Sequence, residues 1–135
     1  ARAPGAAELE KCPASKPQPF SLFIVGSWNN FKPQEMGWEA GCFTHIATIS
    51  KAGSERFQFL LDGDWRLTLY PSIPDATPLD EYMVDGPDTQ GHGKNWLIGK
   101  KGVEEVSPGA SVLIVVVLNV NTSIRFVHWQ QAGAT

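Results

Sequence analysis

An all-β sandwich is the fold class that the sequence predicts, and three features of the chain predict it. Short apolar segments alternate their side chains between two faces, with the period of two that is typical of strands. Turn residues such as Gly, Pro, Asn and Asp separate these segments, about every ten residues. No amphipathic helix of useful length interrupts them. The 135 residues suffice for one domain that buries most of its apolar surface.

The first expected strand covers residues 20–25 and runs into a turn at Asn29-Asn30, because asparagine tolerates left-handed backbone geometry. The next expected strands cover residues 42–50 and 56–61. Asp62-Gly63 between alternating apolar residues is a strong hairpin signal, and it predicts that residues 65–70 return as a strand. Both turns push an aromatic ring out of the sheet, and these rings are Trp28 or Phe31 at the first turn and Trp65 at the second.

Residues 71–94 are rich in Pro and Asp and have no sustained periodicity, so we expect a long loop that is either functional or docked on a neighbour. Pairing resumes at Leu97 and Ile98. The nearly continuous apolar run of residues 111–118 predicts a central strand that is covered on both faces, and residues 124–129 return as its hairpin partner. Some seven or eight short strands in this arrangement predict an immunoglobulin-like β-sandwich.

The predicted module covers residues 20–129. An extended Pro/Ala-rich arm, residues 1–19, precedes it, and residues 130–135 form a tail. The chain opens with Ala1-Arg2-Ala3-Pro4 and no Met. Removal of a leader would be consistent with an organelle lumen, such as that of a plastid, or with secretion. The sequence does not determine which compartment contains the protein.

Composition excludes several partners. The formal net charge of −3 and the pI near 5.5 argue against a nucleic-acid-binding protein, because nucleic acids bind clusters of Lys and Arg. The longest apolar run, residues 112–118, has the length of a strand, so we expect no transmembrane segment. These features are typical of a soluble domain.

Catalytic patterns are missing from the sequence. His45, His92 and His128 are far apart and none has the spacing of metal ligands, so His45 is interpreted as a residue on a sheet face. No Gly-x-Ser-x-Gly elbow is present, and we expect the carboxylate pair Glu104-Glu105 to lie solvated in a turn. The prediction is a protein that is not an enzyme, with no catalytic residue, no metal and no cofactor.

The two cysteines, Cys12 and Cys42, leave two alternatives open. A single disulfide between them would tie the N-terminal arm to the sheet. Alternatively, Cys42 is a small buried apolar residue and Cys12 is a free thiol of the arm.

Two segments of the sequence resemble a known family. The first is the run from Gly26 to Phe31, Gly-Ser-Trp-Asn-Asn-Phe, and the second is the run from Phe57 to Trp65, Phe-Gln-Phe-Leu-Leu-Asp-Gly-Asp-Trp. Together with their spacing they resemble carbohydrate-binding module family 48, and the resemblance covers residues 20–98. That family includes the glycogen-binding domain of AMP-activated kinase β subunits and the N-terminal domains of starch-branching and debranching enzymes. The resemblance implies an early-set immunoglobulin-like sandwich and a non-catalytic binding role.

The resemblance also implies a candidate glucan-binding face. Phe31 falls at the first aromatic residue that stacks on a sugar ring, and Trp65 falls at the second. Gln58 falls where a sugar-bonding Lys is typical, and Lys94-Asn95 fall at a polar Asn-Asn element. Phe31 in place of Trp reduces the stacking area and removes an indole donor. Gln58 in place of Lys keeps hydrogen bonding but loses the charge.

These departures favour a second interpretation over α-glucan binding. In it the tryptophans are packing residues, the sugar site has decayed, and the chain is an accessory subunit docked among other proteins of a larger assembly. The arm, the long loop and the C-terminal hairpin exceed what glucan binding requires. Interfaces bury Trp and Tyr anchors with Arg nearby, so the candidates for such anchors are Arg66, Tyr70, Tyr82 and Trp129.

Overall fold

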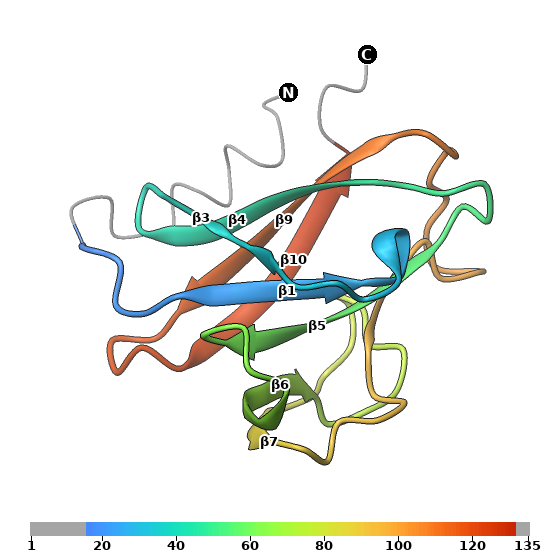
Figure 1. Ribbon diagram of the computed structural model, residues 1–135. Helices are drawn as coiled ribbons and strands as arrows, with labels where there is room; N and C mark the ends of the chain where they lie inside the picture. The colour runs from blue at the N-terminus through green and yellow to red at the C-terminus, as the bar shows by residue number, and fades with distance from the viewer. Residues whose placement is uncertain (1–15, 132–135) are drawn as a thin grey trace.

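Two antiparallel β-sheets form the protein in the computed structural model, which describes residues 16–131 (Figure 1). Sheet A has six strands in the order β2-β1-β5-β6-β7, with β8 also paired to β5, and sheet B has the order β10-β9-β4-β3. The strands of sheet A are β1 (Leu22–Gly26), β2 (Gln34–Glu35), β5 (Glu55–Leu61), β6 (Thr68–Pro71), β7 (Val84–Asp88) and β8 (Trp96–Ile98). The strands of sheet B are β3 (Gly37–Glu39), β4 (Cys42–Thr48), β9 (Ser111–Leu118) and β10 (Ile124–Gln131). The 3-10 helix η1 (Ser27–Asn29) follows β1, and the 3-10 helix η2 (Trp65–Leu67) precedes β6. Because all other elements are strands, the predicted all-β class is confirmed for the described residues.

The core between the sheets is built around aromatic rings. Trp96 has no exposed surface and stacks on Phe57, with ring centroids 5.7 Å apart and planes 17° apart. Phe59 packs on the same indole at 5.0 Å, and Trp129 from β10 meets Phe57 edge to face. Because Phe57 and Phe59 come from β5 and Trp129 comes from β10, this cluster joins the two sheets.

Strand β9 is covered on both faces, as its continuous apolar sequence predicts. Ile114 and Val116 belong to the core between the sheets, whereas Val115 and Val117 pack with Cys42 on the opposite face. Cys42 has no exposed surface and is disulfide-bonded. Cys12, its predicted partner, lies outside the described residues, and that pairing stays a prediction.

Residues 16–131 form ten strands rather than seven or eight, because three short ones were not expected. Strand β7 lies within the stretch predicted as a loop and contains Gly86-Pro87, a pair that normally argues against a strand. It is tolerated because β7 is the outermost strand of sheet A, where the missing N–H of proline interrupts no ladder. Strands β2 and β3 have two and three residues, too few for a periodic pattern.

Two further expectations differ from the structure. Residues 65–67 form η2 instead of strand, because the Asp64 carboxylate accepts a hydrogen bond from the backbone N–H of Arg66 and starts a helical turn. Glu104 is not simply solvated: its Oε1 accepts from the N–H of Gly99 at 2.8 Å and from Nε1 of Trp129 at 2.9 Å. Glu104 therefore holds the end of β8 against β10.

The predicted arm lies mostly outside the described residues, as does the end of the predicted tail; Gln130 and Gln131 belong to β10. None of the helices within residues 16–131 combines the length and the apolar character that crossing a bilayer requires.

Candidate functional site

The outer face of sheet A is the surface that the sequence resemblance singles out. Since Phe57 and Phe59 face the core, alternation along β5 turns Gln58 and Leu60 to the outer face. Val25 of β1 is paired with Gln58 and shares that face. Val25 and Leu60 have no exposed surface, so loops from other parts of the chain must cover this part of the sheet.

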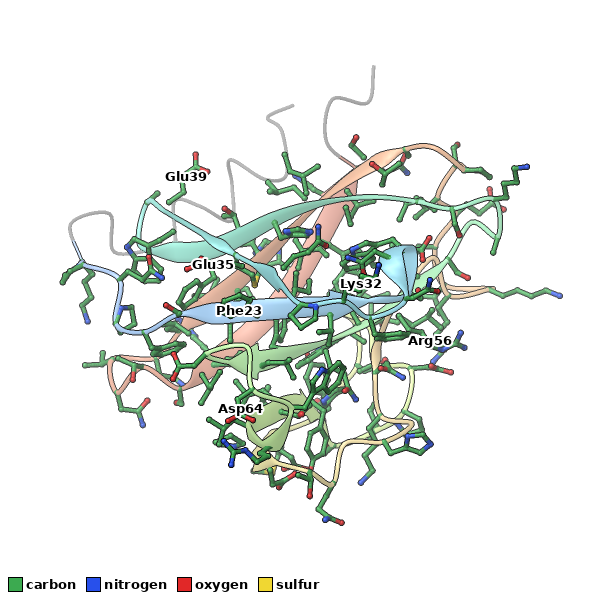
Figure 2. The ribbon with its side chains drawn as sticks, viewed as in Figure 1. Phe23, Lys32, Glu35, Glu39, Arg56 and Asp64 are labelled. Carbon is green, nitrogen blue, oxygen red and sulfur yellow. The ribbon has the colours of Figure 1, made fainter. Side chains whose placement is uncertain are left out.

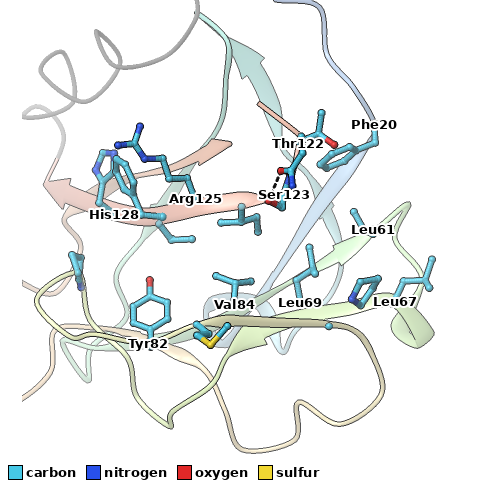
Figure 3. A pocket seen from close by; sticks show the side chains of 18 of the residues that line it. Phe20, Leu61, Leu67, Leu69, Tyr82, Val84, Thr122, Ser123, Arg125 and His128 are labelled. Carbon is cyan, nitrogen blue, oxygen red and sulfur yellow. Dashed lines mark hydrogen bonds between the residues drawn. The ribbon is translucent and has the colours of Figure 1, made fainter. Parts of the chain in front are cut away.

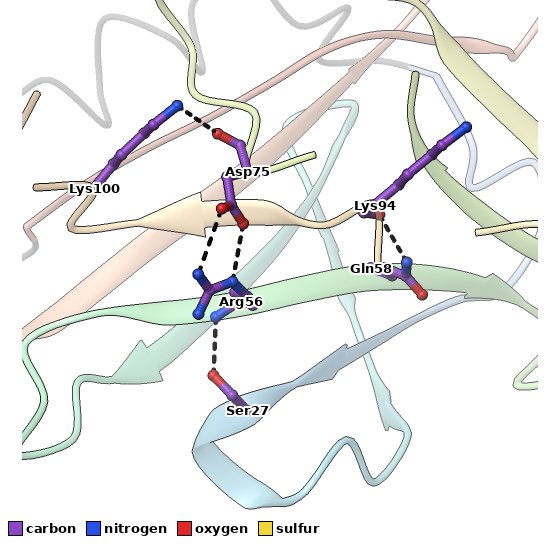
Figure 4. A network of polar contacts seen from close by, with 6 residues as sticks. All are labelled: Ser27, Arg56, Gln58, Asp75, Lys94 and Lys100. Atoms are coloured by element: carbon purple, nitrogen blue, oxygen red, sulfur yellow. Dashed lines mark hydrogen bonds and ion pairs between the residues drawn. The ribbon is translucent and has the colours of Figure 1, made fainter. Parts of the chain in front are cut away.

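Gln58 holds one of these covering loops. Gln58 is 7% exposed, and its Nε2 donates to the backbone oxygen of Gly91 at 2.6 Å. The same Nε2 donates to the backbone oxygen of Lys94 at 2.7 Å (Figure 4). Both hydrogens of the amide are thereby used within the protein. Gln58 lies in the candidate site, but it positions the loop of Lys94 and Asn95, and its NH₂ group is not available to a sugar hydroxyl.

Tyr70 lies under the same loop. Its ring lies so close to Gly91 that a Cβ there would fall 2.5 Å from Cδ1, and Nζ of Lys94 is 5.9 Å from the ring centroid. Burial, followed by a hydrogen bond to Asp88, raises the pKa of Tyr70, so the phenol stays neutral at physiological pH. Asn95 is fixed through its backbone oxygen, which accepts from Ala76 at 3.0 Å.

A polar network borders the site beside β5. Nε of Arg56 donates to Oδ1 of Asp75 at 2.9 Å, the backbone N–H of Arg56 donates to Oγ of Ser27, and Nζ of Lys100 donates to the backbone oxygen of Asp75 (Figure 4). Arg56 is exposed and points to solvent (Figure 2). Sequence reasoning missed this network, because 19 residues separate Arg56 from Asp75 and no motif links them.

The two aromatic residues of the predicted face differ in exposure. Phe31 is half-buried; its N–H donates to the oxygen of Gly26 at 2.8 Å. Asn30 and Phe31 both have left-handed backbone angles, with φ of 61° and 60°, which confirms the turn predicted at Asn29-Asn30. Such a geometry is uncommon for an aromatic residue and costs on the order of 1 kcal/mol. Trp65, by contrast, is 48% exposed.

The candidate residues form a row rather than a compact patch. The turn of Phe31 follows β1 and the turn of Trp65 follows β5, and because these strands are antiparallel the two turns lie at opposite ends of the pair. Gly26 pairs with Phe57 and Leu22 pairs with Leu61, a span of about 14 Å along β5. A ligand that contacts both aromatic residues must therefore be an extended chain.

The four residues predicted as interface anchors differ in how far they are exposed in the structure. Trp129 and Tyr70 are 7% and 4% exposed, so both side chains are buried within the protein itself. Arg66 is exposed and donates from Nη2 to Oδ2 of Asp64 at 2.7 Å, which lowers the pKa of Asp64. Tyr82 is half-buried, and its hydroxyl accepts from Nε1 of Trp96 at 2.8 Å.

No cluster of three or more His, Cys, Asp or Glu side chains that could hold a metal occurs in the part of the chain that the structure describes. His45 is half-buried on β4 and stacks on Trp28, with ring centroids 5.8 Å apart, in accordance with its interpretation as a sheet-face residue. Burial lowers the pKa of His45, so the ring is neutral at physiological pH.

Replacing Gln58 tests its positioning role. The change Gln58→Leu keeps the size of the side chain but removes the side-chain donor of the backbone oxygens of Gly91 and Lys94, and the oxygen of Gly91 then keeps only the N–H of Lys94. We expect the free energy of unfolding to fall by about 2–3 kcal/mol, measured by urea denaturation. The exposed Gln90 of the same loop is the matched control, and Gln90→Leu should change the stability by less than about 0.5 kcal/mol. Equal effects of the two variants would contradict the role.

Comparison of the chain with protein-family models, with curated proteins and with solved structures finds no match. The resemblance to carbohydrate-binding module family 48 accordingly rests on the motif residues alone, and the functions that it implies are treated as proposals.

Proposed function

We propose that this chain is a non-catalytic binding module and that an α-glucan chain binds across the outer face of sheet A. The observation that carries the proposal is the exposure of Trp65, which presents 48% of its surface to solvent beside a sheet whose other large rings are mostly buried. Sugar rings present apolar C–H faces, and a flat exposed indole is the side chain that stacks on them best.

The polar groups near this row suit the hydroxyls of a sugar. Lys94 and Asn95 are half-exposed and belong to the loop that Gln58 holds. Their side chains supply an ammonium donor and an amide that both donates and accepts. Because Gln58 fixes the backbone of this loop, the backbone loses little conformational entropy on binding, which favours affinity.

The dimensions favour an extended oligosaccharide over a single sugar. The ends of the β1–β5 pair that carry the Phe31 and Trp65 turns are separated by about 14 Å, which is the length of several linked rings. With few hydroxyl partners, the affinity should be weak, on the order of a millimolar or somewhat below.

Retention on insoluble starch tests the proposal. The wild-type chain should be retained, and Trp65→Ala should lower the retained fraction to background, because the exposed ring is lost. Ile46→Ala is the matched control, since Ile46 is an apolar side chain that is 61% exposed on β4 of the other sheet. Absence of wild-type retention would exclude α-glucan as the ligand, and retention that Trp65→Ala leaves unchanged would exclude the proposed face as its site.

A second candidate function is that of an accessory subunit docked in a larger protein assembly. A specific observation favours it: Leu79 and Met83 are 82% and 72% exposed in the segment between β6 and β7. Two large exposed apolar side chains four positions apart in one segment are typical of an interaction surface. The two functions use different surfaces and are compatible with one another.

A further inference from the structure

A cleft of about 1050 Å³ lies between the two sheets on the side where β6 and β7 face β10 (Figure 3). Its volume is slightly above the range for sites that hold a small ligand, about 300–1,000 Å³. Leu61, Leu69 and Val84 line it from sheet A, and Ile124 and Val127 line it from β10.

The cleft exists because the two sheets differ in width. Within residues 16–131 sheet A has six strands and sheet B has four, and β10 is the edge strand of sheet B on this side. Leu69 and Val84 point from sheet A toward β10 across the opening (Figure 3). Among the described residues, no strand of sheet B lies beyond β10 to cover β6 and β7.

Strand β10 has an edge suited to pairing. It is eight residues long, whereas β7, the outer strand of sheet A, is five residues long and contains Pro87. Proline and lysine block an edge strand, and β10 contains neither; its charged residue Arg125 lies at a register shift near the start of the strand. Tyr82 occupies one position of this edge, because its hydroxyl accepts from the backbone N–H of Val127.

The charges at the cleft are mainly negative. Asp62, Asp80 and Glu81 line it, against the single guanidinium of Arg125. Asp80 accepts from the N–H of Thr77 at 2.8 Å, which lowers the pKa of Asp80 and keeps it ionised. An occupant with positive charges would therefore be attracted.

We infer that the cleft receives an extended segment of a partner protein with alternating apolar and basic residues, which adds a fifth strand to sheet B beside β10. Backbone hydrogen bonds to the edge of β10 supply the pairing, and the inward side chains cover Leu69 and Val84. The basic side chains lie toward Asp62 and Glu81 at the rim. This inference deepens the accessory-subunit function and is independent of the glucan-binding face, because Leu69 faces the inner side of sheet A and Gln58 the outer side.

The test uses the whole chain labelled with ¹⁵N and three peptides with blocked ends, each about seven residues long and thus about 23 Å as a strand. One alternates Lys and Val, one Lys and Ser, and one Glu and Val. The Lys-Val peptide should slow amide hydrogen exchange along β10 about tenfold or more. The other two should leave that exchange unchanged, because one lacks apolar side chains and the other has the wrong charge.

Matched variants separate the rim charges from general electrostatics. Asp62→Asn with Glu81→Gln should weaken binding of the Lys-Val peptide about two- to tenfold, and Asn tolerates the left-handed geometry of position 62, where φ is 54°. Glu35→Gln with Glu39→Gln, on the short strands β2 and β3 (Figure 2), should leave binding unchanged.

The inference would be overturned by equal binding of the Lys-Ser peptide, by binding that leaves exchange in β10 unaffected, or by absence of Lys-Val binding at millimolar concentration. Changes confined to the cleft lining without protection of β10 would indicate a small apolar ligand and would also overturn it. Trp65→Ala should bind the Lys-Val peptide as the wild type does, so failure of the glucan proposal is distinguishable from failure of this one.

Discussion

Trp96→Ala should lower the free energy of unfolding by about 3–5 kcal/mol, the range for removing a large aromatic side chain from a core. Trp96 has no exposed surface and contacts the rings of Phe57, Phe59 and Tyr82. The surrounding strands of both sheets can close only part of the cavity. Since small domains are stable by about 5–15 kcal/mol, this one change removes much of the total.

Loss of the indole also removes a donor. Nε1 of Trp96 donates to the hydroxyl of Tyr82, which in turn connects to the backbone of Val127 on β10. The measurement is guanidinium denaturation followed by far-UV circular dichroism. Trp65→Ala is the matched control, because Trp65 is half-exposed, and it should cost about 1 kcal/mol or less. A loss below about 1 kcal/mol for Trp96→Ala would contradict the central place of this ring.

Gly99→Ala should lower the free energy of unfolding by about 3 kcal/mol or more, for two separable reasons. The φ angle of Gly99 is +77°, a left-handed conformation in which any side chain is strained. In addition, the new Cβ would lie 2.2 Å from the backbone oxygen of Gly53, so the turn between β4 and β5 must shift.

Gly109→Ala isolates the first of these costs. Gly109 has a similar φ of +83°, but nothing lies within 4 Å of an added Cβ. This variant should lose only about 1 kcal/mol, and the difference between the two variants measures the steric contact alone. Thermal unfolding of both proteins under the same conditions provides the comparison. Equal losses would show that Gly53 moves away without cost.

Much of the fold could be predicted because its signals are local. Asp62-Gly63 forms the expected turn, with φ of 54° and 70°, and the apolar run of β9 is covered on both faces as its composition requires. Strand β7 could not be predicted, since its pairing with β6 depends on tertiary context and overrides the Gly86-Pro87 signal.

The candidate site was less predictable, because burial decides what a side chain can do. The motif placed Gln58 at a ligand position, and only the structure shows that its amide is used by Gly91 and Lys94, 33 and 36 residues away. Trp129 and Tyr70 were expected at an interface on composition alone, whereas their positions in the sheets bury them. Residue type indicates which chemistry is available, and packing determines whether it can be reached.

The distribution of the five tryptophans offers an optical probe that requires no label. Trp96 and Trp129 are buried, Trp28 and Trp38 are half-buried, and Trp65 is the exposed one. An indole in water emits at longer wavelength than an indole in an apolar interior, so the red edge of the emission spectrum should come mainly from Trp65. Iodide, which quenches only accessible rings, would then report when a molecule covers this position, in any buffer and with the unmodified chain.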